Sequence, residues 1–171
     1  MKRLLLTLLL FPFAAFAQTA AQPGCAAYKT NLANEFKIWD MPAVPVLSVA
    51  KPDAIPEIKV GVHHAVALHP HPTVTFGVKP ERDRGGPAVF SGIVKVTVAE
   101  AGIYRVSTGA NQWIDVLRGT AYTPSPQFEN AAGCPIAKTV GYQLNAGETL
   151  TLQVSGNPTN IMGIIVSKAA Q

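Results

Sequence analysis

Apolar and polar residues alternate along most of the chain after residue 57, and a period of two is typical of β-strands. Glycine, proline and asparagine separate the alternating stretches, as expected at turns. The pattern predicts eight short strands, at Ile58–Leu68, Thr73–Gly77, Val89–Val98, Ile103–Thr108, Trp113–Arg118, Thr139–Leu144, Thr149–Val154 and Ile161–Val166. Eight strands of this length indicate an all-β fold, a two-sheet β-sandwich of the jelly-roll kind.

The later strands show the alternation most clearly. One face of the stretch 139–144 carries Val140, Tyr142 and Leu144, and the other carries Thr139, Gly141 and Gln143. This arrangement predicts a sheet with one buried face. Residues 94–109 and 139–156 also share a plan of strand, Ala-Gly turn, strand and glycine. They are interpreted either as two strand–turn–strand units of one jelly roll or as two unrelated hairpins with similar turns.

The chain before residue 57 has a different pattern. Leu32, Phe36 and Trp39 recur at helical spacing, which predicts one short amphipathic helix over Asn31–Trp39. Prolines at 42, 45, 52 and 56 then deny backbone donors, so this stretch is predicted to be an extended connector running over the domain. The expected organisation is a signal peptide at 1–17, a helix and Pro-rich extended segment at 18–56, and a β-sandwich domain at 57–171.

The first seventeen residues have the three parts of a secretory signal peptide. These are Lys2 and Arg3, an apolar run from Leu4 to Phe16, and a small-x-small cleavage site that ends at Ala17. Cleavage there leaves Gln18 as the first residue. The apolar run is shorter than the roughly 20 residues that a membrane-spanning helix needs. We therefore expect a periplasmic or secreted protein with no integral membrane segment after cleavage.

Composition and charge narrow the classes of partner. The chain has 14 Lys and Arg residues against 10 Asp and Glu residues, a formal net charge of +4, and its basic residues are scattered. A nucleic-acid partner is therefore not expected. Charged residues are only 14% of the chain, whereas Gly and Pro number 14 each, which is typical of a turn-rich β protein with few solvated helices.

Cys25 and Cys134 are the two cysteines, and both remain after signal cleavage. An exported protein meets an oxidising compartment, so the two residues are predicted to form one disulfide. This bond would tie the N-terminal segment to the strand that begins near Ile136. Zinc or a nucleophilic thiol would need further ligands or a partner histidine, and the sequence indicates neither.

All four histidines fall between residues 63 and 71. On a strand, His63 and His69 would share one face while His64 lies on the other. His63, His69 and His71 are therefore candidate ligands for zinc or copper, which imidazole nitrogens suit. The alternative is a solvated strand end, because the prolines that flank His71 break strand geometry.

Two further groups of residues have a functional and a structural interpretation. Asp115 and Lys138 lie within apolar strands, so they are either a functional pair or a structural ion pair at the rim of the sheet. Trp113 and Tyr104 either form an aromatic platform for a ligand or fill the core. The mixed run Lys79–Arg84 is predicted to be a solvated loop between strands.

Several short motifs resemble known exported families. The pattern Ala101-Gly102-Ile103-Tyr104, with Leu144-Asn145-Ala146-Gly147, resembles the strands of pre-peptidase C-terminal domains, which are exported β-sandwich modules. Together with Trp113-Ile114-Asp115-Val116 and with Cys134, Ile136 and Lys138, it is similar to a group of small exported bacterial proteins. Some members of that group are labelled homogentisate 1,2-dioxygenases. The resemblance implies an exported β-sandwich without a known ligand.

The residues themselves argue against the dioxygenase label. Such an enzyme holds non-haem iron with two histidines and a carboxylate on a cupin barrel. The nearest approach here is Gly61, His69, His71 and Gly77, but Thr75 or Phe76 stands where the motif requires Glu, and no histidine follows His71. No Gly-x-Ser-x-Gly nucleophile motif is present either.

The sequence therefore predicts a non-catalytic binding or structural module that contacts an envelope protein or a ligand of unknown identity. A metal-binding protein that uses the histidine cluster and an enzyme of unrecognised type are the two alternatives.

Overall fold

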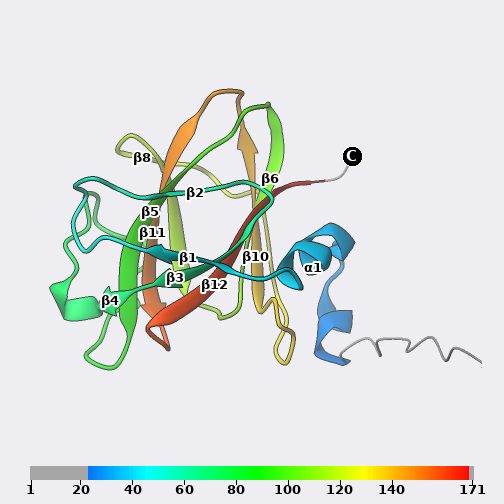
Figure 1. Cartoon of the computed structure of the whole chain (residues 1–171), viewed down its shortest axis with the longest axis horizontal. Helices are drawn as coiled ribbons and strands as arrows, with labels where there is room; N and C mark the ends of the chain where they lie inside the picture. The colour runs from blue at the N-terminus through cyan, green and yellow to red at the C-terminus, as the bar shows by residue number, and fades with distance from the viewer. Residues whose placement is uncertain (1–22, 170–171) are drawn as a thin grey trace, which may run out of the picture.

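The computed structural model of the chain describes residues 23–169, which form two facing β-sheets with one short α-helix against one of them (Figure 1). The predicted all-β, two-sheet sandwich is therefore confirmed. None of the helices in this part of the chain is long and apolar enough to cross a membrane. The predicted signal peptide, residues 1–17, lies outside the described residues.

The strands divide between the sheets in an order that sequence alternation cannot reveal. Sheet A runs β1 (Val44–Leu47), β3 (His63–Ala67), β12 (Ile161–Lys168), β6 (Gly102–Thr108), β10 (Lys138–Leu144) and β9 (Gln127–Asn130). Sheet B runs β2 (Glu57–Ile58), β5 (Phe90–Thr97), β11 (Thr149–Asn157), β7 (Trp113–Arg118) and β8 (Ala121–Tyr122), with β4 (His69–Pro70) also paired to β5. The helical elements are α1 (Ala33–Trp39) and two 3₁₀ turns at Pro23–Ala27 and His71–Thr73.

The connectivity is that of a jelly roll. Strands β5, β6 and β7 alternate between the sheets, as do β10, β11 and β12, so neighbours along the chain face each other across the core. The two stretches with similar plans, 94–109 and 139–156, are therefore crossovers between the sheets rather than hairpins. Their turns also meet, because Gly147 donates a backbone hydrogen bond of 2.8 Å to Val98.

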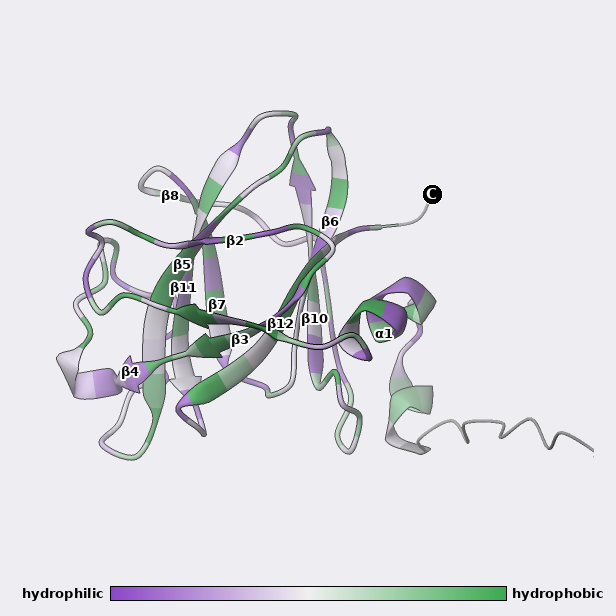
Figure 2. Cartoon of the chain, in the orientation of Figure 1, coloured by the Kyte–Doolittle hydropathy of each residue, from purple (hydrophilic) through white to green (hydrophobic). Residues whose placement is uncertain are grey.

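The core lies between the sheets and consists of the inward residues of both. Ile164, Leu152 and Ile58 are fully buried there, together with the predicted inward set of Val140, Tyr142 and Leu144. Figure 2 shows hydrophobic residues recurring along the central strands β5 and β12. Burial of branched apolar side chains from two facing sheets is the main favourable term in such a fold.

One lateral edge of the sandwich is closed by the chain itself. After β1 leaves sheet A, Val49 forms a bridge with Ile93 of β5 in sheet B. In the same way β3 pairs in sheet A while β4, only two residues later, pairs with β5. Among residues 23–169, no strand pairing joins β8 and β9 at the opposite edge. The sandwich is therefore joined at one edge and open at the other.

The N-terminal segment is covalently attached to the outer side of sheet A. Cys25 and Cys134 form a disulfide with a Cα–Cα distance of 4.9 Å, which confirms the predicted bond. The hydroxyl of Tyr28 donates a hydrogen bond of 2.8 Å to the carbonyl of Ile136, close to the disulfide. Burial, and to a smaller extent the nearby Glu129 carboxylate, raise the pKa of Tyr28 to about 12.

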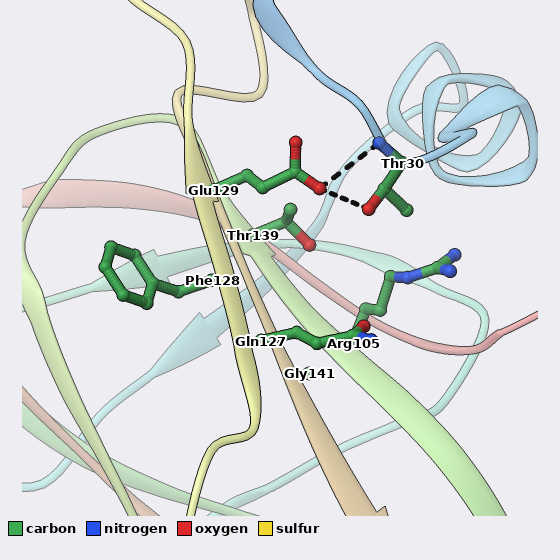
Figure 3. Close-up of a pocket in the computed structure, with 7 residues that line it drawn as sticks. All are labelled: Thr30, Arg105, Gln127, Phe128, Glu129, Thr139 and Gly141. Atoms are coloured by element: carbon green, nitrogen blue, oxygen red, sulfur yellow. Dashed lines mark hydrogen bonds between the residues drawn. The ribbon is translucent and has the colours of Figure 1, made fainter.

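Two carboxylates extend this attachment. Glu129 of β9 accepts hydrogen bonds from the backbone N–H and the hydroxyl of Thr30 (Figure 3). Glu35 of α1 is only 1% exposed and accepts from Arg105 at 3.1 Å and from Ser167 at 2.7 Å. These contacts bury polar residues on the outer face of sheet A, where the alternating pattern predicted a solvated face.

Three predicted segments differ from the structure. The Pro-rich stretch contains β1, which pairs in parallel with β3; Pro45 is tolerated because β1 is an edge strand that needs donors on one side only. The stretch 58–68 is interrupted by a turn at Gly61, whose φ of +75° favours glycine. Thr73–Gly77 is not a strand, because a 3₁₀ turn at His71–Thr73 and an irregular segment replace it.

Candidate functional site

A cavity of about 380 Å³ opens at the unjoined edge of the sandwich, and we call it the Trp113 pocket. Both sheets line it: Trp113 and Ile114 belong to β7 in sheet B, and Lys138, Val140 and Tyr142 belong to β10 in sheet A. The volume is within the range of small-molecule sites, roughly 300–1,000 Å³. The pocket thus lies at the edge where, among the described residues, no strand pairing joins the two sheets.

The pairing of β7 explains the position of the cavity. Its outer neighbour β8 pairs only with Leu117 and Arg118, so the first half of β7 has no strand on that side in the described part of the chain. Trp113 is the first residue of this half and is partly exposed. Phe128 of β9 closes the opposite wall, and Figure 3 shows its ring on the other side of β9 from Glu129.

Three cationic groups surround the Trp113 ring. The guanidinium carbons of Arg82 and Arg84 lie 5.1 Å and 5.9 Å from the ring centre, and Lys138 Nζ lies 5.1 Å from it. At these distances the electron-rich ring face attracts cations. Trp113 therefore gathers positive charge at the pocket.

Lys138 is a buried ammonium with no carboxylate partner among residues 23–169. Its exposed fraction is 6%, and its Nζ donates a hydrogen bond of 2.9 Å to the carbonyl of Gln112. No salt bridge joins it to any carboxylate among the described residues. The pKa of Lys138 is lowered to about 8, mainly by burial; Arg84 and Arg82 also lower this pKa, whereas the Asp115 carboxylate raises it.

Asp115 contacts Trp113 rather than Lys138. Its carboxylate is 3% exposed and accepts hydrogen bonds from the indole Nε1 of Trp113 at 2.7 Å and from the backbone of Glu81 at 3.3 Å. Burial raises the pKa of Asp115 in spite of these bonds. The possible structural ion pair between Asp115 and Lys138 is thus not a direct contact: the indole of Trp113 interacts with both charged groups.

Arg82 and Arg84 come from the run that the sequence indicated to be a solvated loop. That loop is fixed to the outward side chains of β11. Gln153 donates to the carbonyl of Val78 at 2.9 Å, and the Ser155 hydroxyl accepts from the Arg84 backbone and donates to the Arg82 carbonyl, both at 3.3 Å. Both arginines remain exposed, so they form the solvent-facing rim of the pocket.

A glycine permits this close docking. Gly156 has a φ of +79°, and a Cβ at this position would lie 2.5 Å from the Cβ of Arg84. Arg84 also donates from its guanidinium to the carbonyl of Asn111 at 2.7 Å. The charge run alone did not indicate this role, but the Gln-x-Ser-Gly sequence at the end of β11 is a local signal of an approaching backbone.

The structure does not bring His63, His69 and His71 together. His63 stacks on Trp39 with ring centres 4.4 Å apart, and the Nε2 of His69 donates to the carbonyl of Ser48 at 2.9 Å. Within residues 23–169, no group of three or more His, Cys, Asp or Glu side chains is placed to hold a metal ion.

His71 has a different environment, between a serine and an aspartate. Its Nδ1 shares a hydrogen bond of 2.8 Å with Ser91, and its Nε2 lies 3.4 Å from Asp83. Serine, histidine and aspartate in contact resemble the groups of a hydrolase triad. Ser91 is 0% exposed, however, so no substrate reaches its hydroxyl in this conformation. We interpret the contact as the attachment of the 79–86 loop to β5.

Tyr104, the other aromatic residue of the predicted platform, lies in the core. It is 3% exposed and donates its hydroxyl hydrogen to the carbonyl of Glu100 at 3.0 Å. Of these two aromatic residues, Trp113 is the one that lines the pocket. No protein-family model, curated protein or solved structure matches the chain, so the resemblances in the sequence stay predictions.

Proposed function

We propose that this chain is a periplasmic or secreted, non-catalytic binding protein that takes up a small organic anion in the Trp113 pocket. The observation that carries the proposal is Lys138, a buried ammonium that lines a cavity and has no carboxylate partner among the described residues. A buried charge is costly unless it is paired. An anion in the pocket would supply the missing partner.

The remaining lining residues define the kind of anion. Arg82 and Arg84 add two positive charges at the rim, against Glu81 as the acidic lining residue. Guanidinium groups bind carboxylates and phosphates through paired hydrogen bonds. Ile114, Val140 and Phe128 contribute apolar surface that suits a flat hydrophobic body. The pocket is therefore best matched by an anion attached to an aromatic or other compact apolar group.

The compartment rests on two independent features. The Cys25–Cys134 disulfide is of the kind that persists in oxidising compartments, and the first seventeen residues have the pattern of a secretory signal. Export places the pocket among the solutes and envelope components outside the cytoplasm. A binding role there requires only the affinity of the pocket and no catalytic group.

The test is a titration of the mature protein with benzoate and with benzamide, which have the same body and differ in charge. Intrinsic fluorescence reports on Trp113 once Trp39, the other tryptophan, is replaced (Trp39→Phe). We expect benzoate to bind and benzamide to bind at least tenfold more weakly, since one charge-assisted contact contributes about 1.5–3 kcal/mol. Equal responses to both probes, or none to either, would reject the proposal.

Variants locate the site. The double variant Arg82→Gln/Arg84→Gln and the single variant Lys138→Met should each weaken benzoate binding. Arg118→Gln is the matched control, because Arg118 pairs with Glu148 at 2.9 Å and does not line the pocket. Benzoate binding that is equally reduced in the control would indicate a general charge effect rather than this site.

A further inference from the structure

Lys138 differs from the other lysines of the described chain in its burial, and two further features of its surroundings matter for chemistry. It is almost fully buried, it lines a cavity shared by both sheets, and its Nζ donates to one neutral carbonyl, that of Gln112. Lys168, by contrast, is paired with Glu100, and Lys51 and Lys59 are exposed. A lysine of this kind, desolvated and close to other cations, is the type that forms imines with carbonyl compounds.

From this geometry, and resting on the proposed function, we infer that the Trp113 pocket takes anions that carry an aldehyde or ketone group, and that Lys138 binds them covalently and reversibly as an imine. Arg82 and Arg84 hold the anionic group, and the Trp113 ring supports the body of the ligand. The guanidinium carbons of Arg82 and Arg84 and the Nζ of Lys138 all lie between 5.1 and 5.9 Å from the centre of the Trp113 ring. One small ligand can therefore contact these three groups and the ring.

The chemistry requires no further reactant. The lone pair of the neutral Lys138 amine attacks the carbonyl carbon and forms a C–N bond. The carbonyl oxygen then leaves as water with the two protons that the nitrogen gives up, and a C=N bond remains. No oxidation or reduction occurs, and addition of water reverses the step.

The neutral amine is accessible near physiological pH. A pKa of about 8 for Lys138, against an ordinary value of 10.5, makes the neutral fraction at pH 7 larger by a factor on the order of a hundred. The two neighbouring arginines keep the pocket positive when Lys138 loses its proton. Attraction of the anion and nucleophilicity of the amine are therefore compatible.

The test is reductive trapping of the mature protein with 4-carboxybenzaldehyde and cyanoborohydride, followed by peptide mapping. We expect Lys138 to be modified first, about tenfold or more ahead of exposed Lys51 and Lys59. Its rate of modification should rise with pH through about 8. Uncharged benzaldehyde is the matched probe and should show a smaller preference for Lys138.

Controls separate the site from general lysine reactivity. In denaturant the preference for Lys138 should disappear, and Arg82→Gln/Arg84→Gln should slow trapping of 4-carboxybenzaldehyde more than of benzaldehyde. Even labelling of all lysines in the folded protein would overturn the inference. Tight benzoate binding without trapping at Lys138 would reject the imine and leave the proposed function standing, whereas loss of both would reject the two together.

Discussion

Trp113 donates a hydrogen bond of 2.7 Å from its indole Nε1 to Asp115, two residues further along the same strand. Side chains at i and i+2 share one face of a strand, so the contact is local and needs no rearrangement of the sheet. It fixes the orientation of the ring over which Arg82, Arg84 and Lys138 gather. The buried carboxylate therefore acts on the pocket through the ring that it positions.

Asp115→Asn and Asp115→Ala form a pair that tests this positioning. Both remove the negative charge, but the asparagine retains an oxygen that can accept from the indole. We expect Asp115→Ala to bind benzoate about tenfold more weakly than Asp115→Asn, because a buried donor without an acceptor costs about 1–3 kcal/mol. Fluorescence titration in the Trp39→Phe background measures the difference. Equal affinities for the two variants would show that the hydrogen bond does not support the site.

Lys138 predicts a specific dependence of stability on pH. Its pKa falls from an ordinary 10.5 to about 8 on folding, mainly through burial. Between these two values the unfolded chain holds a proton that the folded chain does not. The free energy of unfolding should therefore rise with pH across that window, by about 3 kcal/mol from this residue.

Chemical denaturation of the wild type and of Lys138→Met at pH 7, 8, 9 and 10 checks this dependence. The difference between the two proteins should change across the window in the stated direction. At pH 7 the variant should be at least as stable as the wild type, because it no longer buries an ammonium at a cost of about 3 kcal/mol and no carboxylate loses a direct partner. A loss of several kcal/mol would instead support the direct ion pair with Asp115.

Gly85 and Gly86 give a matched test of the loop that carries the two arginines. A methyl group at Gly85 would overlap the ring of His71. That ring cannot easily move, because Ser91 and Asp83 contact its two nitrogens. A methyl group at Gly86 would instead meet its nearest neighbour, Val89, at 4.0 Å. Gly85→Ala should shift the loop and weaken benzoate binding several-fold, and Gly86→Ala should leave the affinity unchanged. Identical affinities in the two variants would mean that the placement of the loop does not control binding.

The Cys25–Cys134 disulfide encloses a sequence separation of 109 residues. Chain-entropy arguments assign about 4.7 kcal/mol to a loop of this size. Cys25→Ala/Cys134→Ala should therefore lower the free energy of unfolding by several kcal/mol, and limited proteolysis should cut the segment before residue 44 first. If the variant unfolds at the same temperature as the oxidised wild type, the contacts of Glu35 and Glu129 hold the segment without the bond.

The inward face of the later strands, the helix and the disulfide could be predicted from the sequence alone, because the signals for them are local. The alternation of Val140, Tyr142 and Leu144 predicted an inward face, and the helical spacing of Leu32, Phe36 and Trp39 predicted α1 to within two residues of its start. The presence of two cysteines after a predicted signal peptide was sufficient to predict their pairing. Each of these inferences needs only neighbouring residues or a count.

Only the tertiary structure decided the site, because its parts are distant in sequence and belong to different sheets. Which strands share a sheet depends on pairings such as β7 with β11, which alternation does not encode. Arg82 and Arg84 belong to a run with the pattern of a solvated loop. They line a pocket because Ser155 holds that loop against β11 and Gly156 leaves room for it. In the sequence, Lys138 and Asp115 suggested a functional pair or an ion pair. In the structure the ring of Trp113 contacts both residues, and long-range packing brings Lys138 of sheet A to that ring.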